Sequence, residues 1–449
     1  MRAMKDSGIE WIGRIPENWA TPPLRSKYSF GKGLAITKAD LADDGAPVIS
    51  YGQIHAKDNI GVAVRDTLIR YLPLDHSSLT ESSKTESGDL IFADTSEDVQ
   101  GCGNCVYIDR KESIYAGYHT LILRPKVKGL GRYYAYLFAS DAWRSQVRAN
   151  VAGVKVYSIT QDILKKTILL EPPSEEQEGI VAFLDAKCSE IDSLIAAKEK
   201  TNALLKERRQ SLIYEAVTKG LDATVPMKDS GIEWIGTIPE NWKTCRIKHL
   251  VDTSHPYPVG DGDHGMIKAD DYQTEGIPYI RVLNLSWGTG LNLDDLVYIS
   301  EELNDRIKNS ELRPNDILIA KTGATIGKTA IVPDSLTLSN TTSHVGKITI
   351  SPAYNAKYFF YVMTSFVVQK QIIDLSSMQS TRPELGIDGL KNLIVTLPPM
   401  DDQQSISNYL DSQCAVIDSM IGSTDDMIRT LKEYRQSLIY EAVTGKIEV

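Results

Sequence analysis

The chain opens on a stretch that it later repeats letter for letter, Met4-Lys5-Asp6-Ser7-Gly8-Ile9-Glu10-Trp11-Ile12-Gly13. The second copy occupies residues 227–236, and both copies continue into Ile-Pro-Glu-Asn-Trp. Another shared stretch, Arg-Gln-Ser-Leu-Ile-Tyr-Glu-Ala-Val-Thr, closes the two halves at residues 209–218 and 435–444. The sequences between these shared ends diverge strongly. The repeat therefore predicts two different readers on one scaffold, and it favours recognition of a two-part target over a single catalytic pocket.

The composition is ordinary for a soluble globular protein of 449 residues, a length that suits two large units with helical connectors. The net charge is −10, but the acidic excess lies mainly in the second half and in the connectors, so a polyanionic partner is not excluded. Five cysteines are an odd, sparse set that suits a reducing compartment. Neither a secretory signal nor an apolar run long enough to cross a bilayer is visible, so a cytoplasmic location is expected.

Two long helices are predicted by apolar residues that recur at intervals of three and four. The stripes begin at Ile180 and Ile406 and continue over about five heptads, which is the spacing of a coiled-coil seam. The predicted interface positions are Leu184, Ile191, Ile195, Leu205 and Leu212 in the first helix and Leu410, Ile417, Ile421, Ile428, Leu431 and Leu438 in the second. Each helix follows a Pro-Pro pair with acidic residues behind it and ends near a glycine, Gly220 or Gly445.

Polar residues inside the seam indicate that the two helices pair with each other. Lys198, Asn202 and Thr424 fall at seam positions, where polar side chains fix the register and orientation of a coiled coil. We therefore expect an antiparallel pair. The alternative is that each helix is buried separately against its own domain.

The predicted fold class is α+β, with two strand-rich domains joined by two long helices in a pseudo-two-fold internal repeat. Short apolar runs introduced by turn residues predict strands at matching places in the two halves, and residues 133–147 and 358–373 predict one helix each. The boundaries are residues 1–171 for the first domain, 172–222 for the first connector helix, 223–397 for the second domain and 398–449 for the second helix. Loops at the strand ends are the expected binding positions.

Three stretches look like catalytic or metal motifs but depart from them. Residues 323–329 resemble a phosphate-binding loop but have one residue too few between the glycines. Residues 260–265 match a dinucleotide pattern by letter, but they follow Pro-Tyr-Pro instead of a strand and carry two aspartates. Cys102 and Cys105 have zinc-knuckle spacing without a second pair, so His119 would be their only helper. We therefore expect a non-catalytic chain with no metal or cofactor of its own.

Taken together, the repeated motifs resemble the specificity subunit of a type I restriction–modification system. They are the Ile-Pro-Glu-Asn-Trp openings, Gly-Asp-Leu-Ile at residues 88–91, Asn-Asp-Ile-Leu at residues 315–318, Thr-Gly-Ala-Thr-Ile-Gly-Lys at residues 322–328, and the shared helix starts and ends. The resemblance covers essentially the whole chain, in the order of a target-recognition domain and a helix, twice. The first half departs from it at residues 94–98, where Asp-Thr-Ser-Glu-Asp replaces the Lys-Thr-Gly-Ala-Thr of residues 321–325.

The resemblance implies a subunit that binds double-stranded DNA and directs two methylation subunits and, in the full complex, restriction subunits. Each domain would read one half of a bipartite, asymmetric site, and the helix pair would set the gap. S-adenosylmethionine and ATP with Mg²⁺ would be bound by the partners. Two other classes stay open: a coiled-coil adaptor without sequence-selective DNA binding, and a self-sufficient enzyme.

Candidate DNA contacts follow from residue chemistry at the predicted strand ends. Side chains and backbone N–H groups of a Gly-rich loop can hold phosphate oxygens, and Arg or Asn can make bidentate contacts to guanine or adenine. In the second domain the candidates are Lys321, Thr322, Thr325 and Lys328 on the loop, Arg281, Asn284 and Ser286 after a strand, and Gln379 and Arg382 in a late segment. In the first domain they are Ser50, Tyr51, Gln53, Thr95, Ser96, Lys155 and Tyr157. For each residue the alternative is a surface polar group or a loop-stabilising hydrogen bond.

Overall fold

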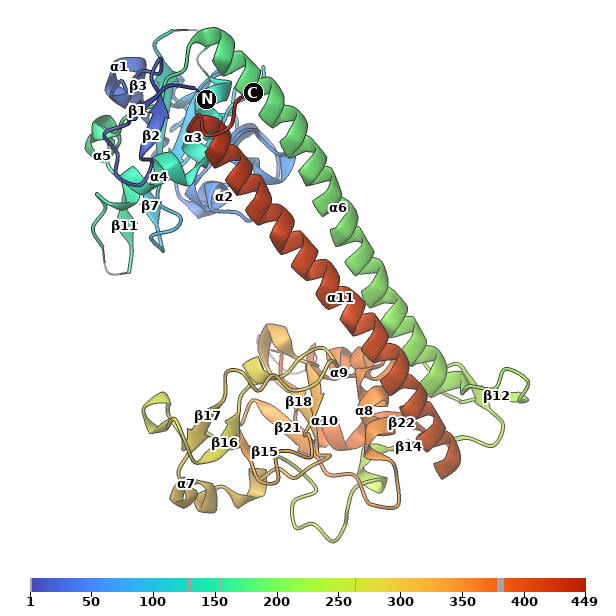
Figure 1. The fold of residues 1–449 in the computed structure, drawn as a ribbon. Coiled ribbons are helices and arrows are strands. Elements are labelled where there is room, and N and C mark those ends of the chain that lie inside the picture. Colours follow the sequence, from blue (N-terminus) through green and yellow to red (C-terminus); the bar gives the residue numbers. More distant parts are fainter. Residues whose placement is uncertain (1, 128, 130, 154, 263, 378–382) are drawn as a thin grey trace. The chain divides into compact units, whose positions relative to one another are not determined.

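The computed structural model describes residues 2–127, 129, 131–153, 155–262, 264–377 and 383–449. The chain divides into two compact units, Met1–Ala197 with Met427–Val449, and Lys198–Asp426. Each unit combines one strand-rich domain with part of each of two long helices, α6 (Ser174–Lys219) and α11 (Met400–Val443) (Figure 1). The division therefore passes through both helices, whereas the boundaries read from the sequence keep each helix whole.

The first unit is built on a four-stranded antiparallel sheet in the order β3-β10-β6-β8. A three-stranded sheet in the order β5-β4-β9 pairs β4 antiparallel with β5 and parallel with β9. Two antiparallel ribbons, β1-β2 and β7-β11, complete it. The strands are β1 (Met4–Asp6), β2 (Arg14–Pro16), β3 (Tyr28–Lys32), β4 (Ala46–Ile49), β5 (Arg70–Leu72), β6 (Leu90–Ala93), β7 (Thr95–Ser96), β8 (Cys105–Tyr107), β9 (Tyr115–Ala116), β10 (Thr120–Pro125) and β11 (Tyr157–Ser158).

The second unit repeats this arrangement. Its four-stranded sheet has the order β15-β21-β18-β19, and its three-stranded sheet, β17-β16-β20, again has one antiparallel and one parallel pair. The strands are β12 (Met227–Asp229), β13 (Thr237–Pro239), β14 (Lys243–Arg246), β15 (Val259–Asp261), β16 (Ile277–Ile280), β17 (Val297–Ile299), β18 (Ile317–Ala320), β19 (Thr329–Ile331), β20 (Asn340–Thr341), β21 (Val345–Ile348) and β22 (Ile394–Leu397). The predicted α+β fold with an internal repeat is confirmed.

The sequence was wrong to predict one helix in each stretch before the connectors, because each is a pair of helices. Ser140 separates α3 (Arg132–Ala139) from α4 (Asp141–Arg148), and Ser365 separates α8 (Ala356–Thr364) from α9 (Phe366–Ser377). Both serines have extended backbone, and each hydroxyl donates to a carbonyl three residues back. A short polar side chain thereby replaces the helical hydrogen bond and turns the chain.

The remaining helices are short. The α-helices are α1 (Leu24–Lys27), α2 (Tyr51–Ile54), α5 (Gln161–Lys166), α7 (Glu301–Arg306) and α10 (Ile387–Asn392). The 3₁₀ turns are η1 (Lys38–Asp40), η2 (Asp66–Leu68), η3 (Glu81–Ser83), η4 (Ile247–His249), η5 (Ala269–Asp271), η6 (Val282–Asn284), η7 (Lys308–Ser310) and η8 (Gly323–Thr325). Over the described part of the chain, no helix is both long and apolar enough to span a bilayer.

The central strands are buried on both faces. All four residues of β6 and all four of β18 are buried. On β6, Leu90 and Phe92 join the core that includes α3 and α4, whereas Ile91 and Ala93 join a second cluster on the opposite face. Because a strand covered on both sides must be apolar throughout, polar side chains are confined to the loops at its ends.

In each unit, a stretch of α6 packs against a stretch of α11 (Figure 1). Within the second unit, Asn202 pairs with Asp425 and Arg209 pairs with Asp418, so residue numbers rise along one helix as they fall along the other. The helices are therefore antiparallel. The predicted interface positions Leu184 and Leu410 are fully buried, while Leu205, Ile421 and Leu431 are partly buried. The other predicted positions, Ile191, Ile195, Leu212, Ile417, Ile428 and Leu438, are buried.

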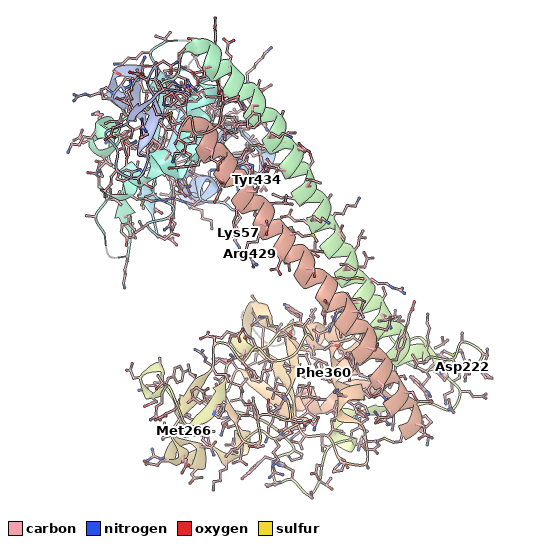
Figure 2. The ribbon with its side chains drawn as sticks, in the orientation of Figure 1. Lys57, Asp222, Met266, Phe360, Arg429 and Tyr434 are labelled. Atoms are coloured by element: carbon pink, nitrogen blue, oxygen red, sulfur yellow. The ribbon has the colours of Figure 1, made fainter. Side chains whose placement is uncertain are left out.

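The polar residues of the seam act in different ways. The amide nitrogen of Asn202 donates to Asp425 Oδ1 at 2.7 Å across the seam, whereas the hydroxyl of Thr424 donates to Met420 within its own helix. Lys198 is half-buried. By contrast with these buried or half-buried side chains, Tyr434, which is also on α11, is 54% exposed (Figure 2). A cross-helix bond that holds the register is therefore made by Asn202.

Candidate nucleic-acid interface

The turn after β4 is built by two of the predicted contact residues. Ser50 precedes α2, and its backbone N–H donates to Gln53 Oε1 at 3.2 Å, which closes the first turn. The Ser50 side chain is fully buried, while Tyr51 is partly exposed and packs edge-on against Tyr118 with ring centroids 5.6 Å apart. Among the predicted contacts of this turn, Tyr51 therefore has an aromatic ring that is accessible in this conformation.

The structure brings together residues that the sequence places about sixty positions apart. Strand β7 pairs with β11, so Ser96 lies opposite Tyr157 and Thr95 lies opposite Ser158 (Figure 1). The hydroxyl of Thr95 donates to Asp94 Oδ1 and that of Ser96 donates to the carbonyl of Asp98, both at 2.7 Å. Lys155 is exposed beside this ribbon. Lys155 is therefore exposed beside the ribbon, whereas Tyr157 is half-buried against the core of the unit and the two hydroxyls stabilise the loop.

In the second unit, the candidates after β16 are held by their own loop. The backbone N–H of Arg281 donates to Asn284 Oδ1 at 2.9 Å, and the guanidinium of Arg281 donates to the carbonyl of Asp295 at 3.0 Å. Asn284 is fully buried, and its amide nitrogen donates to the carbonyls of Asn292 and Asp295. Ser286 donates to Gly290 at 2.7 Å. Arg281, with a side chain 21% exposed, and the half-buried Ser286 still reach the surface, whereas Asn284 does not.

The loop after β18 contains one buried and one accessible lysine. The Nζ of Lys321, 3% exposed, forms an ion pair with Asp261. Thr322 contacts His344, and Thr325 accepts a hydrogen bond from the backbone of Lys328. Lys328 is partly exposed and forms no ion pair with any residue that the structure describes. The available cation for a phosphate is therefore Lys328, whereas the charge of Lys321 is already matched.

Two exposed histidines also lie at these strand ends and were not among the contact residues predicted from the sequence. His119 directly precedes β10 and His344 directly precedes β21, and both are exposed. Nδ1 of His119 lies 3.4 Å from Asp94 Oδ1, and Nδ1 of His344 lies 3.0 Å from the hydroxyl of Thr322. The signal was present, because a histidine opens the same strand in both halves of a chain that has 7 histidines.

Two of the stretches that resemble catalytic or metal motifs can be located in the structure. Residues 323–325 form the 3₁₀ turn η8. Burial raises the pKa of the Cys105 thiol to about 12, which favours the protonated thiol. Within the described ranges, no three His, Cys, Asp or Glu side chains are grouped to hold a metal ion. The predicted contacts Gln379 and Arg382 lie outside the described residues.

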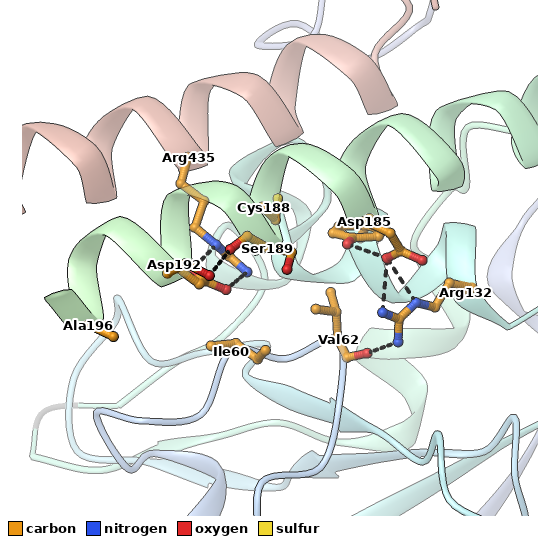
Figure 3. A pocket seen from close by; sticks show the side chains of 11 residues that line it. Ile60, Val62, Arg132, Asp185, Cys188, Ser189, Asp192, Ala196 and Arg435 are labelled. Atoms are coloured by element: carbon orange, nitrogen blue, oxygen red, sulfur yellow. Dashed lines mark hydrogen bonds and ion pairs between the residues drawn. The ribbon is translucent and has the colours of Figure 1, made fainter.

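The two domains are attached to the long helices by matching contacts. In the first unit, Asp185 on α6 accepts hydrogen bonds from Arg132 at 2.9 Å and from the hydroxyl of Tyr136 at 2.6 Å (Figure 3). In the second unit, Asp411 on α11 accepts from Lys357 at 2.6 Å and from Tyr361 at 2.8 Å. Burial, together with the nearby carboxylate, raises the pKa of both tyrosines well above the ordinary range, so their hydroxyls remain donors.

A pocket of about 570 Å³ opens beside the first of these contacts. It is lined by Ile60 and Val62 from the domain and by Asp185, Asp192 and Arg435 from the helices (Figure 3). Its charges are paired, because Arg435 bonds Asp192 at 3.0 Å while Asp185 bonds the domain. The pocket therefore belongs to the joint between domain and helices.

The family model for the type I restriction modification DNA specificity domain matches residues 16–206 and, a second time, residues 239–421. The chain belongs to this family. Each match covers one strand-rich domain and much of the helix that follows it. The specificity domain is therefore present twice, as the repeat predicts.

Similar proteins are described as specificity subunits of type I restriction enzymes. The type I restriction enzyme EcoBI specificity subunit of Escherichia coli is 28% identical over 318 residues, which cover 70% of this chain and 65% of that protein. The EcoKI specificity subunit of E. coli K12 is 20% identical over 457 residues, which cover 97% of this chain and 90% of that one. The chain thus spans just under two thirds of the EcoBI subunit in the matched region.

A solved structure shares the fold of the whole chain. One chain from a structure on the assembly and conformational transition of the type I R-M system has a TM-score of 0.65 and 16% sequence identity, over 96% of this chain and 99% of that one. The architecture of two specificity domains and two long helices is therefore shared at low sequence identity.

Proposed function

We propose that this chain is the specificity subunit of a type I restriction–modification complex and binds double-stranded DNA. Each domain reads one half of a bipartite, asymmetric site, and the pair formed by α6 and α11 sets the gap. The proposal is carried by one observation: the specificity domain occurs twice, on the same frame, with different residues at the equivalent strand ends. Strand ends that carry different residues in two otherwise equivalent domains suit recognition of two different half-sites.

The partners follow from this assignment. Two methylation subunits, joined by restriction subunits in the full complex, would bind this chain in the cytoplasm. They would supply methyl transfer from S-adenosylmethionine and the ATP- and Mg²⁺-dependent steps. This chain would take no catalytic step and would place the partners on DNA. The specificity-subunit descriptions of the relatives support this division.

The direct test is a genome-wide map of methylated adenines in cells that contain the methylation subunit with or without this chain. We expect methylation at a single interrupted, asymmetric sequence that appears when the chain is present. A map that does not depend on the chain would favour an adaptor without sequence-selective binding. Methyl transfer by the purified chain alone would instead favour a self-sufficient enzyme.

The role of the helices has its own test. Four residues inserted into α6 near Asn202 lengthen the helix by roughly 6 Å. Because base pairs are spaced about 3.4 Å apart along the duplex, the gap should grow by one or two base pairs while both half-sites stay the same. A variant that also carries a matched insertion in α11 near Ile428 has two helices of equal length. Its gap should be comparable to that of the variant with the α6 insertion alone. An unchanged gap in an active variant would show that the helices do not set it.

A further inference from the structure

Two exposed histidines occupy equivalent positions in domains whose loops otherwise differ. The carbonyl of His119 accepts the backbone N–H of Asp94 at 3.1 Å, and the carbonyl of His344 accepts that of Lys321 at 2.9 Å. Each histidine therefore sits where the strand after it meets the loop after β6 or β18. The residue type persists at this point even though Asp94 in one loop corresponds to Lys321 in the other.

The ring of His119 is exposed yet held in place. Its side chain is 59% exposed, and its ring packs edge-on against Tyr51 at 5.4 Å and Tyr118 at 6.0 Å. Asp94 approaches Nδ1 from a third side. The backbone of His119 has φ +54°, a left-handed conformation that is uncommon outside glycine and that concentrates at functional sites. Such an arrangement keeps a surface ring ready for a ligand.

One ring nitrogen of His119 is available to a ligand. Nδ1 lies 3.4 Å from Asp94 Oδ1, whereas Nε2 makes no hydrogen bond to any part of the chain that the structure describes. In the major groove, an imidazole nitrogen can accept a hydrogen bond from the amino group of adenine or cytosine or, when it carries a proton, donate one to guanine or thymine. His344 contacts a hydroxyl, which can donate or accept, so its ring can take either tautomer.

We propose that His119 and His344 are specificity-determining residues that contact base edges, one in each half-site. This inference rests on the proposed function and names residues that carry it out. Asp94 is the positioning residue for His119.

The experiment selects DNA from a pool of random duplexes with the full chain in complex with its methylation subunit, and sequences what is bound. His119→Gly removes the ring and suits the left-handed backbone. We expect a loss of base preference at one position of the first half-site, by about tenfold to a hundredfold, with the second half-site unchanged. His344→Ala should cause a loss of preference at one position of the second half-site and leave the first half-site unchanged. The control is His249→Ala, which removes an exposed histidine of η4.

Each outcome of this experiment supports or overturns the inference. Uniformly weaker binding with unchanged sequence preference would overturn the inference and leave a phosphate or structural role. If the unsubstituted complex selects no sequence, the proposed function fails, which is a different result. A second variant, Asp94→Asn, covers the case in which His119→Gly does not fold: it removes the carboxylate that contacts the ring, so the base preference at the same position should change while the second half-site stays the same. Unchanged preference in a folded Asp94→Asn complex would overturn the positioning role of Asp94.

Discussion

The loops after β6 and β18 occupy the same place in the two units and carry opposite charge. The first contains Asp94, Glu97 and Asp98, and the second contains Lys321 and Lys328. Both are tied by a backbone hydrogen bond to the histidine that opens the neighbouring strand. The difference teaches that the edge of the sheet is free to change its chemistry, because it lies beyond the buried strand and contributes little to the core.

The frame behind these loops is constrained in the opposite way. The side chain of Gln146 bonds both backbone groups of Ile168, and Gln371 bonds those of Ile394 in the same manner. Removing a partner from a buried polar group costs about 1–3 kcal/mol, so a change at either place is penalised. The two halves therefore stay alike at buried positions, where the loss of a hydrogen bond is costly, and they differ in the loops beyond the strands.

The largest effect should come from breaking the frame at Arg209. Its side chain is 6% exposed, pairs with Asp418 at 2.9 Å and also donates to the carbonyl of Gly288. Arg209→Ala leaves a carboxylate unpaired in a partly buried site, so we expect a loss of about 3 kcal/mol in the free energy of unfolding of the second unit. Urea unfolding followed by hydrogen exchange in each unit measures this.

The matched variant is Arg435→Ala in the first unit. Arg435 pairs with Asp192 at 3.0 Å, and its side chain is 12% exposed. Arg435 lines an open pocket, and no loop carbonyl like that of Gly288 appears among its described hydrogen bonds. We expect a smaller loss, of about 1–2 kcal/mol. Equal losses in the two units would show that the carbonyl of Gly288 adds nothing.

In the loop after β16 of the second unit, Arg281→Ala should change sequence specificity more than it changes the stability of the unit. A guanidinium that leaves Asp295 can contact guanine, and its loss should cost about 1–3 kcal/mol of discrimination at one position of the second half-site. Competition binding with single-base variants of the site measures the effect. Arg306→Ala, which removes an exposed arginine of α7, is the control. Equal weakening on every sequence would assign Arg281 to the backbone of DNA or to the loop itself.

The smallest effects should come from charges at the two loops. Lys328→Ala removes one phosphate contact, so the slope of log affinity against log salt should flatten by about one unit on all sequences. Glu97→Lys places a cation in the acidic loop of the first unit and should steepen the slope by up to a similar amount. Salt titrations of binding measure both slopes. A changed methylation sequence with an intact slope in Lys328→Ala would contradict the phosphate role.

Much of the fold was predictable because it is written in local patterns. Apolar spacing, proline pairs and terminal glycines placed the long helices close to their observed bounds at Ser174–Lys219 and Met400–Val443. The repeat predicted two equivalent domains. The breaks at Ser140 and Ser365 were not predictable from periodicity, because the apolar pattern continues across each serine while its hydroxyl turns the backbone.

The candidate site was predictable in position and less so in its individual side chains. The sequence alone determined that polar residues gather after buried strands, since an apolar strand leaves no other place for them. Only the tertiary structure decided which of them are accessible: Asn284 and Lys321 are satisfied inside, while Lys328 and His119 face outward. The pairings of Lys321 with Asp261 and of Thr95 with Ser158 join residues about sixty positions apart. Such contacts depend on how distant strands meet, and a local pattern of residues carries no record of that.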